Sequence, residues 1–181
     1  MKYLKIIIPI SILSLVFIID YYNKYYKPNT SFEAESIFLY VMKDDSIAFR
    51  DSISKYIKSE KTFYKVAEKL GYLENIKTGR FKIKRGIGNN DIVNSLKFNN
   101  TPVNVTFNNQ ERVEDLAGRI SNQIYEDSIS LLSAFTDQDF LEKNNLNEKN
   151  VLSIFIPNSY NIYWNTTSEN FRDRMLSEYT V

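Results

Sequence analysis

The first apolar stretch of the chain is long enough to raise the question of a membrane. Two lysines precede the run at residues 6–19, and Asp20 ends it. As a helix this run covers about 21 Å at about 1.5 Å per residue, which is less than the ~30 Å of a hydrocarbon core. Residues 3–22 reach about 30 Å if Lys5 extends its amine toward the membrane surface. The pattern therefore predicts either a spanning helix or the core of a signal peptide.

The residues around this run favour an anchor that is kept. Four tyrosines follow it and are suited to the membrane–water interface, whereas small residues of a signal-peptidase site are missing after the apolar core. The preceding Lys2 and Lys5 favour a cytoplasmic N-terminus. We expect residues 1–27 to form an uncleaved single-pass anchor with an extracytoplasmic body. A removed signal peptide and a buried helix of a soluble protein are the two alternatives.

Residues 28–100 alternate between strand and helix patterns. The expected elements are a strand at 36–41, a helix at 47–57 capped by Asp45 or Ser46, a helix at 62–70 ended by Gly71, a half-buried strand within 78–86, and a helix at 91–98 capped by Asn89 or Asn90. This order predicts a small β-α-α-β module with one further helix.

A second module is expected to begin at Thr101, next to Pro102. The expected elements are a strand at 103–107, a turn at 108–110, a helix at 111–124, short helices at 127–135 and 138–144, a strand-like run at 152–156, a turn at 158–159, and a helix beginning near Ser168. Asp127 and Asp137 are expected as N-caps or first-turn acids of the two short helices. The fold class is therefore α+β, with an N-terminal transmembrane helix followed by two small units.

Composition removes several classes of function. Lys and Arg total 23 against 22 Asp and Glu, so the net charge of +1 provides no field for nucleic acid. The chain has no histidine and no cysteine, which excludes Cys/His dyads, Ser-His-Asp triads, disulfides and the usual zinc sites. We expect no metal and no cofactor. Any catalysis by such a chain would use carboxylates, Lys, Tyr or Ser.

The acidic residues have a structural interpretation. Glu111, Glu114 and Asp115 lie near an expected helix start, where the helix dipole favours the ionised carboxylate. A glycosidase acid needs an apolar pocket that raises its pKa instead. We interpret these side chains, and Glu126 further on, as solvated surface charge.

The aromatic residues near the C-terminal part offer a candidate binding site. Tyr160, Tyr163 and Trp164 have flat faces that can stack on sugar rings, and Asn158 can donate and accept hydrogen bonds. The same rings could equally fill a core between a sheet and a helix. Both interpretations stay open from the sequence.

The segment that contains these residues, VLSIFIPNSYNIYW at 151–164, resembles the Phe/Leu-x-Pro-Asp-Thr-Tyr segment of the MltG (YceG-like) endolytic murein transglycosylases. Asn158 and Asn161 stand where many members have acidic residues. The Glu-Gly turn common in the family reads Asn109-Gln110 here. The region 28–100 is similar to the LysM-like part of the same family, through its Gly-x-Phe-x-Ile strand and the helix that follows.

This resemblance implies a function and a location. The family cleaves bonds between N-acetylmuramic acid (MurNAc) and N-acetylglucosamine (GlcNAc) within peptidoglycan glycan strands, leaving 1,6-anhydroMurNAc ends. By resemblance, residues 1–27 are a membrane anchor, 28–100 a LysM-like module and 101–181 the N-terminal part of the catalytic domain. The implied location is the inner membrane with the body in the periplasm. The implied partners are glycan strands and proteins of cell-wall synthesis or division.

The resemblance also implies what the chain lacks. In the family the catalytic glutamate lies downstream of this segment, so it is expected C-terminal to Val181, and the final helix carries no stop signal before that residue. We expect residues 1–181 to be a partial and inactive enzyme, with Asn158, Tyr160, Tyr163 and Trp164 as substrate-binding candidates. The alternative is a non-catalytic, membrane-tethered scaffold that binds peptidoglycan or the cell-wall machinery. An extracytoplasmic subunit without a glycan role is a third possibility.

Overall fold

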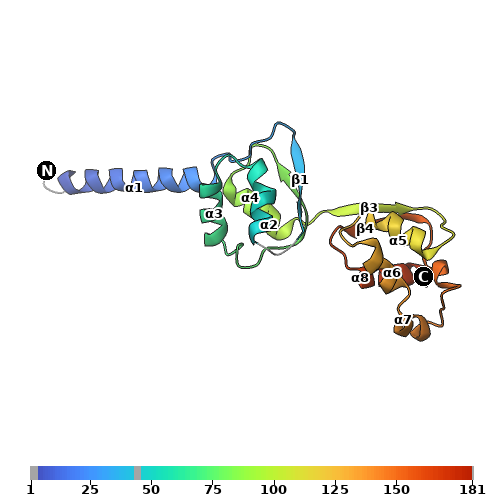
Figure 1. The fold of residues 1–181 in the computed structure, drawn as a ribbon. Helices are drawn as coiled ribbons and strands as arrows, with labels where there is room; N and C mark the ends of the chain where they lie inside the picture. The colour runs from blue at the N-terminus through green and yellow to red at the C-terminus, as the bar shows by residue number, and fades with distance from the viewer. Residues whose placement is uncertain (1–3, 43–45, 181) are drawn as a thin grey trace. The chain divides into compact units, whose positions relative to one another are not determined.

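The computed structural model describes residues 4–42 and 46–180, and within them the fold is mixed α and β (Figure 1). The chain forms two compact units, one ending at Asn100 and the other beginning at Thr101. Each unit contains its own cluster of buried apolar side chains.

The first unit contains the predicted order of strand, helix, helix, strand and helix after an N-terminal helix. Its elements are α1 (Leu4–Tyr25), β1 (Ser36–Val41), α2 (Ser46–Ile53), the 3-10 turn η1 (Ser54–Tyr56), α3 (Glu60–Lys69), β2 (Gly79–Lys84) and α4 (Asn89–Phe98). β1 and β2 pair antiparallel, with Leu39 opposite Phe81. Alternate residues of both strands face inward and meet buried side chains of α3 and α4, such as Phe63 and Leu96.

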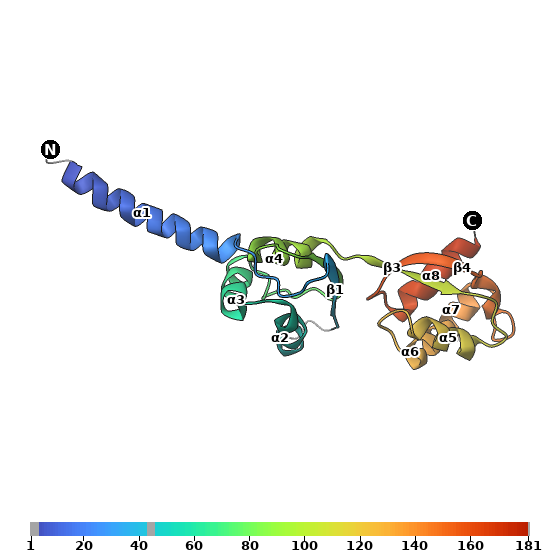
Figure 2. The same cartoon turned by 90° about the horizontal axis from the view of Figure 1, so that it is seen from above.

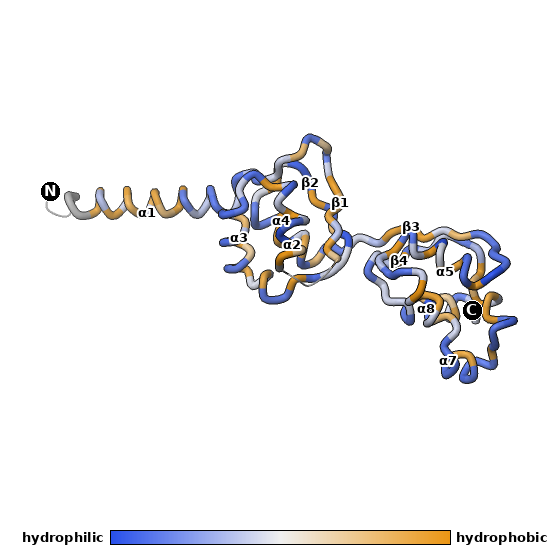
Figure 3. Tube along the Cα trace, in the orientation of Figure 1, coloured by the Kyte–Doolittle hydropathy of each residue, from blue (hydrophilic) through white to orange (hydrophobic). Residues whose placement is uncertain are grey.

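Helix α1 leaves its apolar side chains uncovered. Most side chains from Ile7 to Ile19 are at least half exposed, and Phe17 is 65% exposed; Figure 3 shows these apolar positions along the helix. The hydroxyls of Ser11 and Ser14 donate to carbonyl oxygens within the helix, so they need no water. Among the described residues, this helix is long and apolar enough to cross a membrane. Its exposure disfavours the alternative of a buried helix in a soluble domain.

The end of α1 is fixed to the first unit by buried polar contacts. The Asn29 side chain accepts from the Ser59 backbone N–H over 2.8 Å and donates to Oδ1 of Asn89 over 2.7 Å. Asn89 in turn donates to the carbonyl oxygen of Lys24 over 2.7 Å. Both asparagines are buried. Figure 2 shows the end of α1 beside α3 and α4.

Two details of the first unit differ from the sequence analysis. The expected cap of α4, Asn89 or Asn90, is wrong because Gly88 occupies the cap and the Asn89 side chain is used in the contacts just described. The expected helix 47–57 ends at Ile53 and continues as η1. The cap expected at Asp45 or Ser46 lies outside the described residues and side chains. Gly71 has the predicted left-handed conformation, with φ of 67°.

In the part that the structure describes, the second unit combines four helices with a two-stranded sheet. Its elements are β3 (Pro102–Phe107), α5 (Val113–Ser121), α6 (Ser128–Phe135), α7 (Gln138–Lys143), the 3-10 turn η2 (Val151–Ile154), β4 (Asn158–Tyr163) and α8 (Ser168–Tyr179). β3 and β4 are antiparallel, with Val105 opposite Tyr160. The inward side chains of the sheet join the core formed with α5, α6 and α8.

The segment before β4 is not the predicted strand. Residues 151–154 form η2, which buries Val151 and Ile154 at a spacing of three, whereas Ile156 is 41% exposed. A spacing of three is that of a 3-10 helix and not of a strand. The expected turn at Asn158 and Ser159 is also wrong, because both residues belong to β4 and pair with β3.

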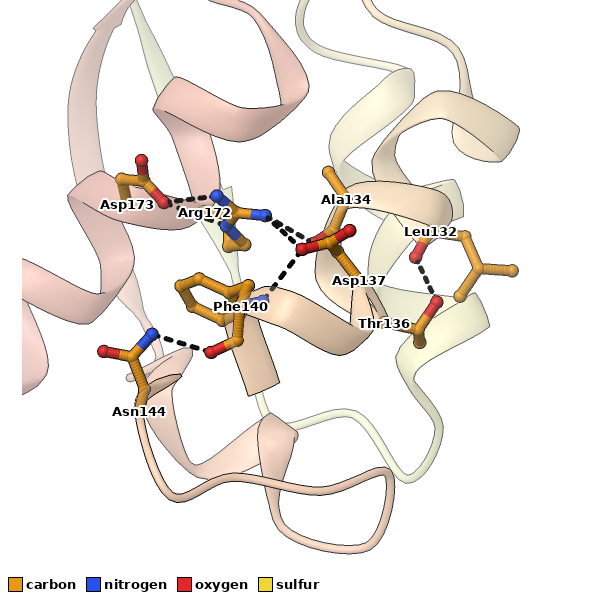
Figure 4. Close-up of polar contacts among 8 residues, drawn as sticks. All are labelled: Leu132, Ala134, Thr136, Asp137, Phe140, Asn144, Arg172 and Asp173. Atoms are coloured by element: carbon orange, nitrogen blue, oxygen red, sulfur yellow. Dashed lines mark hydrogen bonds and ion pairs between the residues drawn. The ribbon is translucent and has the colours of Figure 1, made fainter. Parts of the chain in front are cut away.

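Arg172 of α8 holds three elements of this unit together (Figure 4). Its guanidinium donates to the carbonyl oxygen of Ala134 over 3.0 Å and to the Asp173 carboxylate over 2.9 Å. It also lies 3.9 Å from the ring centroid of Phe140 and 3.9 Å from a carboxylate oxygen of Asp137. The side chain is almost buried, and its charge is compensated from both sides.

Candidate functional site

The four candidate residues of the sequence analysis lie on or just after β4, but they do not converge. Asn158 begins the strand and Tyr163 ends it, so they are about 17 Å apart at about 3.4 Å per residue. Tyr160 faces inward, Tyr163 faces outward, and Trp164 follows the end of the strand.

Tyr160 is a core residue in this structure. Its side chain is 8% exposed, its ring stacks on Phe107 with centroids 5.6 Å apart, and its hydroxyl donates to the carbonyl oxygen of Ile156 over 2.6 Å. Burial raises the pKa of this hydroxyl. These contacts use both the ring and the hydroxyl, so Tyr160 positions β4 and offers no face to a ligand.

Trp164 and Tyr163 lie in a different environment. The Trp164 indole contacts the ring of Tyr125 with centroids 5.1 Å apart, and Trp164 is half-buried. Tyr163 is 54% exposed and Tyr125 39% exposed. We call Tyr125, Tyr163 and Trp164 the aromatic corner. It presents ring surface at the end of the sheet, as the sugar-stacking interpretation requires.

Backbone and side-chain bonds hold the aromatic corner in place. The Tyr125 N–H donates to the Trp164 carbonyl oxygen over 2.8 Å, and the Thr166 N–H donates to that of Tyr163 over 2.9 Å. The buried Ser168 hydroxyl donates to the carboxylate of Glu126 over 3.2 Å. Glu126 is therefore not the solvated helix-face charge expected from the sequence, because it is half-buried and tied to the start of α8.

The outward face of the sheet continues from Tyr163 as a row of small polar groups. Asn104 lies opposite Asn161, and Thr106 lies opposite Ser159, with the two hydroxyl oxygens 2.7 Å apart. All four side chains are exposed. We call them the polar strip. An aromatic ring beside several amides and hydroxyls is a combination that can stack on a sugar ring and hydrogen-bond to its hydroxyls.

A separate groove lies near the other end of the sheet. It has a volume of about 660 Å³ and is lined by Glu111, Arg112, Val113, Glu114, Leu132, Thr136, Glu148, Lys149 and Leu152. None of the four candidate residues lines it. The groove is therefore a concave surface of mixed charge that is separate from the candidate residues.

The chemistry of this groove is not that of a proton donor at Glu114. The carboxylate of Glu114 lies 3.3 Å from the Arg112 guanidinium. Its own backbone N–H and Arg112 lower the pKa of Glu114. A carboxyl with a lowered pKa is ionised at neutral pH, as expected for an acid at a helix start.

Two further residues shape this surface and carry no signal in the sequence. Tyr125 completes the aromatic corner from a turn after α5, where no periodic pattern marks it. The amide of Gln123 donates to and accepts from the backbone of Thr106, over 3.0 and 2.9 Å, and so covers one edge of β3. Neither contact has a local signal, because the partners come from elements far apart in sequence.

Comparison with known proteins places the chain in a family. Residues 45–181, well over half of the chain, match the model of the YceG-like family. A comparison with curated proteins found no match. The 2.6 Å crystal structure of a yceG-like protein from Listeria monocytogenes is similar at 14% identity, with a TM-score of 0.40, over 80% of this chain and 54% of that one. The chain thus spans about half the length of that protein. It belongs to the YceG-like family, which is the MltG family of murein transglycosylases.

Proposed function

We propose that this protein is a membrane-anchored endolytic murein transglycosylase. It cleaves MurNAc–GlcNAc bonds within glycan strands and leaves 1,6-anhydroMurNAc ends. The family match over residues 45–181 is the observation that carries this proposal. In it, α1 crosses the inner membrane, both units lie in the periplasm, and peptidoglycan strands are the substrate.

The second unit contributes a surface on which a glycan strand rests. Tyr163 supplies an exposed ring, and the polar strip beside it supplies amides and hydroxyls on the same face of the sheet. Glycan strands are uncharged along their sugar backbone, so neutral donors and acceptors suit them better than ion pairs do. In this proposal Trp164 packs against Tyr125 beside the stacking ring's position in the chain, and Asn158 lies at the far end of the same strand.

The chemistry needs one carboxylic acid in the active site. That acid protonates the glycosidic oxygen as the sugar gains oxocarbenium character, and its conjugate base then takes the proton of the MurNAc 6-hydroxyl. The family resemblance assigns this role to a glutamate C-terminal to Val181. The residues up to Val181 are then concerned with anchoring and with holding the strand.

The LysM-like module has a proposed role of its own. Residues 28–100 are proposed to bind glycan weakly and so keep the enzyme on its polymer. Retention of purified residues 28–100 on insoluble peptidoglycan would support this role. Release in the first wash would reduce the module to a spacer between the membrane and the second unit.

The test of the whole proposal uses purified peptidoglycan sacculi. The chain is expected to sediment with them and to release no anhydromuropeptides, as measured by mass spectrometry. Tyr163→Ala is expected to weaken retention about tenfold, since a stacked ring contributes about 1 kcal/mol or slightly more. Tyr179→Ala removes a similarly exposed ring from α8 and serves as the matched control.

The outcomes separate enzyme from scaffold. In-frame codons after Val181 that encode an apolar helix with a Glu-Thr pair would support the enzyme, and that glutamate becomes the residue to mutate. A stop codon there would favour the tethered, non-catalytic scaffold. Anhydromuropeptides released by residues 1–181 themselves would refute the assignment of the catalytic acid.

A further inference from the structure

A polar cavity lies where α1 enters the first unit. It has a volume of about 440 Å³ and is lined by Asn23, Lys27, Pro28, Asn29, Lys58, Ser59, Thr62 and Asn89. These residues come from the last turn of α1, the segment that follows it, and the starts of α3 and α4. The cavity is therefore formed within one unit and has walls from four parts of the chain.

The charge of this lining is positive. Lys27 and Lys58 are both exposed, and neither forms an ion pair with an acidic side chain in the described part of the chain. The lining contains no carboxylate. By contrast, the nearby Lys24 pairs with Asp20 one helical turn earlier. Two cations that form no ion pair with the described acidic side chains are suited to an anionic ligand.

The floor of the cavity is rigid. Asn29 and Asn89 are buried and bonded to each other and to the backbone of Ser59 and Lys24. Because these amides are already satisfied, they fix the shape of the cavity. The charged amines at its mouth are the groups left to meet a ligand.

The position of the cavity just beyond the apolar span favours a ligand at the membrane surface. The candidate span ends at Tyr25, so Asn23 lies in its last turn and Lys27 lies two residues beyond it. At about 1.5 Å per residue, Asn23 and Lys27 are within about 6 Å of one another along the direction of the helix axis. Headgroups occupy about 5–8 Å on each side of the hydrocarbon core. With α1 anchored as proposed, Lys27 lies at the depth of the lipid phosphates, and Lys58 lines the same cavity.

We propose that this cavity binds the phosphate of an anionic phospholipid headgroup. The lysine amines contact the phosphate oxygens, and the cavity above the last turn of α1 receives the polar part of the headgroup. The proposal rests on the proposed membrane anchorage of α1. Its consequence is that the first unit is held against the membrane surface in a defined orientation and does not rotate freely about the anchor.

The test is lipid binding by the full chain in detergent, measured by native mass spectrometry. Phosphatidylglycerol is expected to bind at least about tenfold more tightly than phosphatidylcholine. The double variant Lys27→Gln/Lys58→Gln is expected to lose affinity for phosphatidylglycerol by about fivefold per lysine. Lys61→Gln/Lys65→Gln makes the same charge change on exposed positions of α3 outside the cavity and is expected to bind as the unchanged chain does.

Further outcomes distinguish the possible failures. Equal affinity for the two lipids would overturn the headgroup proposal. Glycerol phosphate in solution that competes as well as the lipid would also overturn it, since the site would then serve a free phosphate. Extraction of the chain from membranes by alkaline carbonate would instead refute the anchorage, which is a failure of the proposed function and not of the cavity chemistry.

Discussion

Asn29 donates a hydrogen bond of 2.7 Å to Asn89, a residue sixty positions away in the chain. The Asn89 side chain in turn donates a hydrogen bond to the carbonyl oxygen of Lys24, at the end of α1. Two buried amides therefore join the candidate anchor helix to the module that follows it. In the proposed anchored protein, this junction fixes the orientation of the first unit relative to α1, which a flexible linker would not do.

Removal of the Asn89 amide is expected to weaken the first unit. Asn89→Ala leaves the Lys24 carbonyl and part of the Asn29 amide without partners in a buried place. We expect a loss of about 1–3 kcal/mol in the free energy of unfolding, measured by urea denaturation with far-UV circular dichroism. Asn90→Ala, next in the chain and less buried, is the control. Equal effects of the two variants would show that the junction contributes little.

Gly88 tests the same junction by steric means. A Cβ at this position would lie 2.6 Å from the carbonyl carbon and oxygen of Tyr26. Its φ of −84° is ordinary for any residue, so the cost is contact and not backbone strain. Gly88→Ala is expected to destabilise the first unit by about 1–3 kcal/mol.

The matched control for Gly88 is another glycine with free space around it. A Cβ at Gly118, inside α5, would meet nothing within 4 Å. Gly118→Ala is expected to stabilise the second unit by about 0.5–1 kcal/mol, because alanine favours a helix over glycine. A neutral Gly88→Ala would mean that the Tyr26 backbone moves away at no cost.

Arg172 gives a prediction for the second unit. Arg172→Lys keeps the charge but loses the planar guanidinium, which donates to both Ala134 and Asp173. It also loses the contact of the guanidinium with the ring of Phe140. We expect a loss of about 2–4 kcal/mol in thermal or urea unfolding. Arg174→Lys, on an exposed side chain of the same helix, is expected to change stability by less than about 0.5 kcal/mol.

Asp127 makes part of the stability of the second unit depend on pH. The backbone N–H and then the hydroxyl of Ser130 lower the pKa of Asp127 below its ordinary value of 3.8. The ionised Asp127 carboxylate therefore stabilises the folded state fully above pH 3.8, the ordinary pKa. This stabilisation is lost as the pH falls through the lowered pKa of the folded state.

The variant Asp127→Asn isolates this effect. Its stability relative to the unchanged chain is expected to be lowest near neutral pH, and the difference is expected to shrink below pH 3.8. Urea unfolding at several pH values measures it. A difference that stays the same at every pH would show that the ionised carboxylate is not the stabilising species.

Local signals in the sequence predicted the ends of several elements. Gly71 adopts the left-handed conformation, and Asp127 and Asp137 accept from the backbone N–H of Ser130 and Phe140. These features depend on residues within three positions, so a sequence pattern contains them in full.

Features that depend on distant partners were not predictable in the same way. Residues 152–156 have the alternating apolar pattern of a strand, yet residues 151–154 form η2, in which a spacing of three places Val151 and Ile154 in the core. The role of Asn89 depends on a partner sixty residues earlier. For the site, the choice between core and surface at Tyr160 was open until the register opposite Val105 placed it inward.

The measurement that tests the glycan-binding surface most directly uses the single tryptophan of the chain. Trp164 contacts Tyr125 and is adjacent to Tyr163, so its fluorescence reports on the aromatic corner. Titration with soluble GlcNAc–MurNAc oligosaccharides is predicted to give a saturable change in emission, which Tyr163→Ala weakens and Tyr179→Ala leaves intact. Emission that stays constant to millimolar oligosaccharide would contradict a glycan-binding role for this surface.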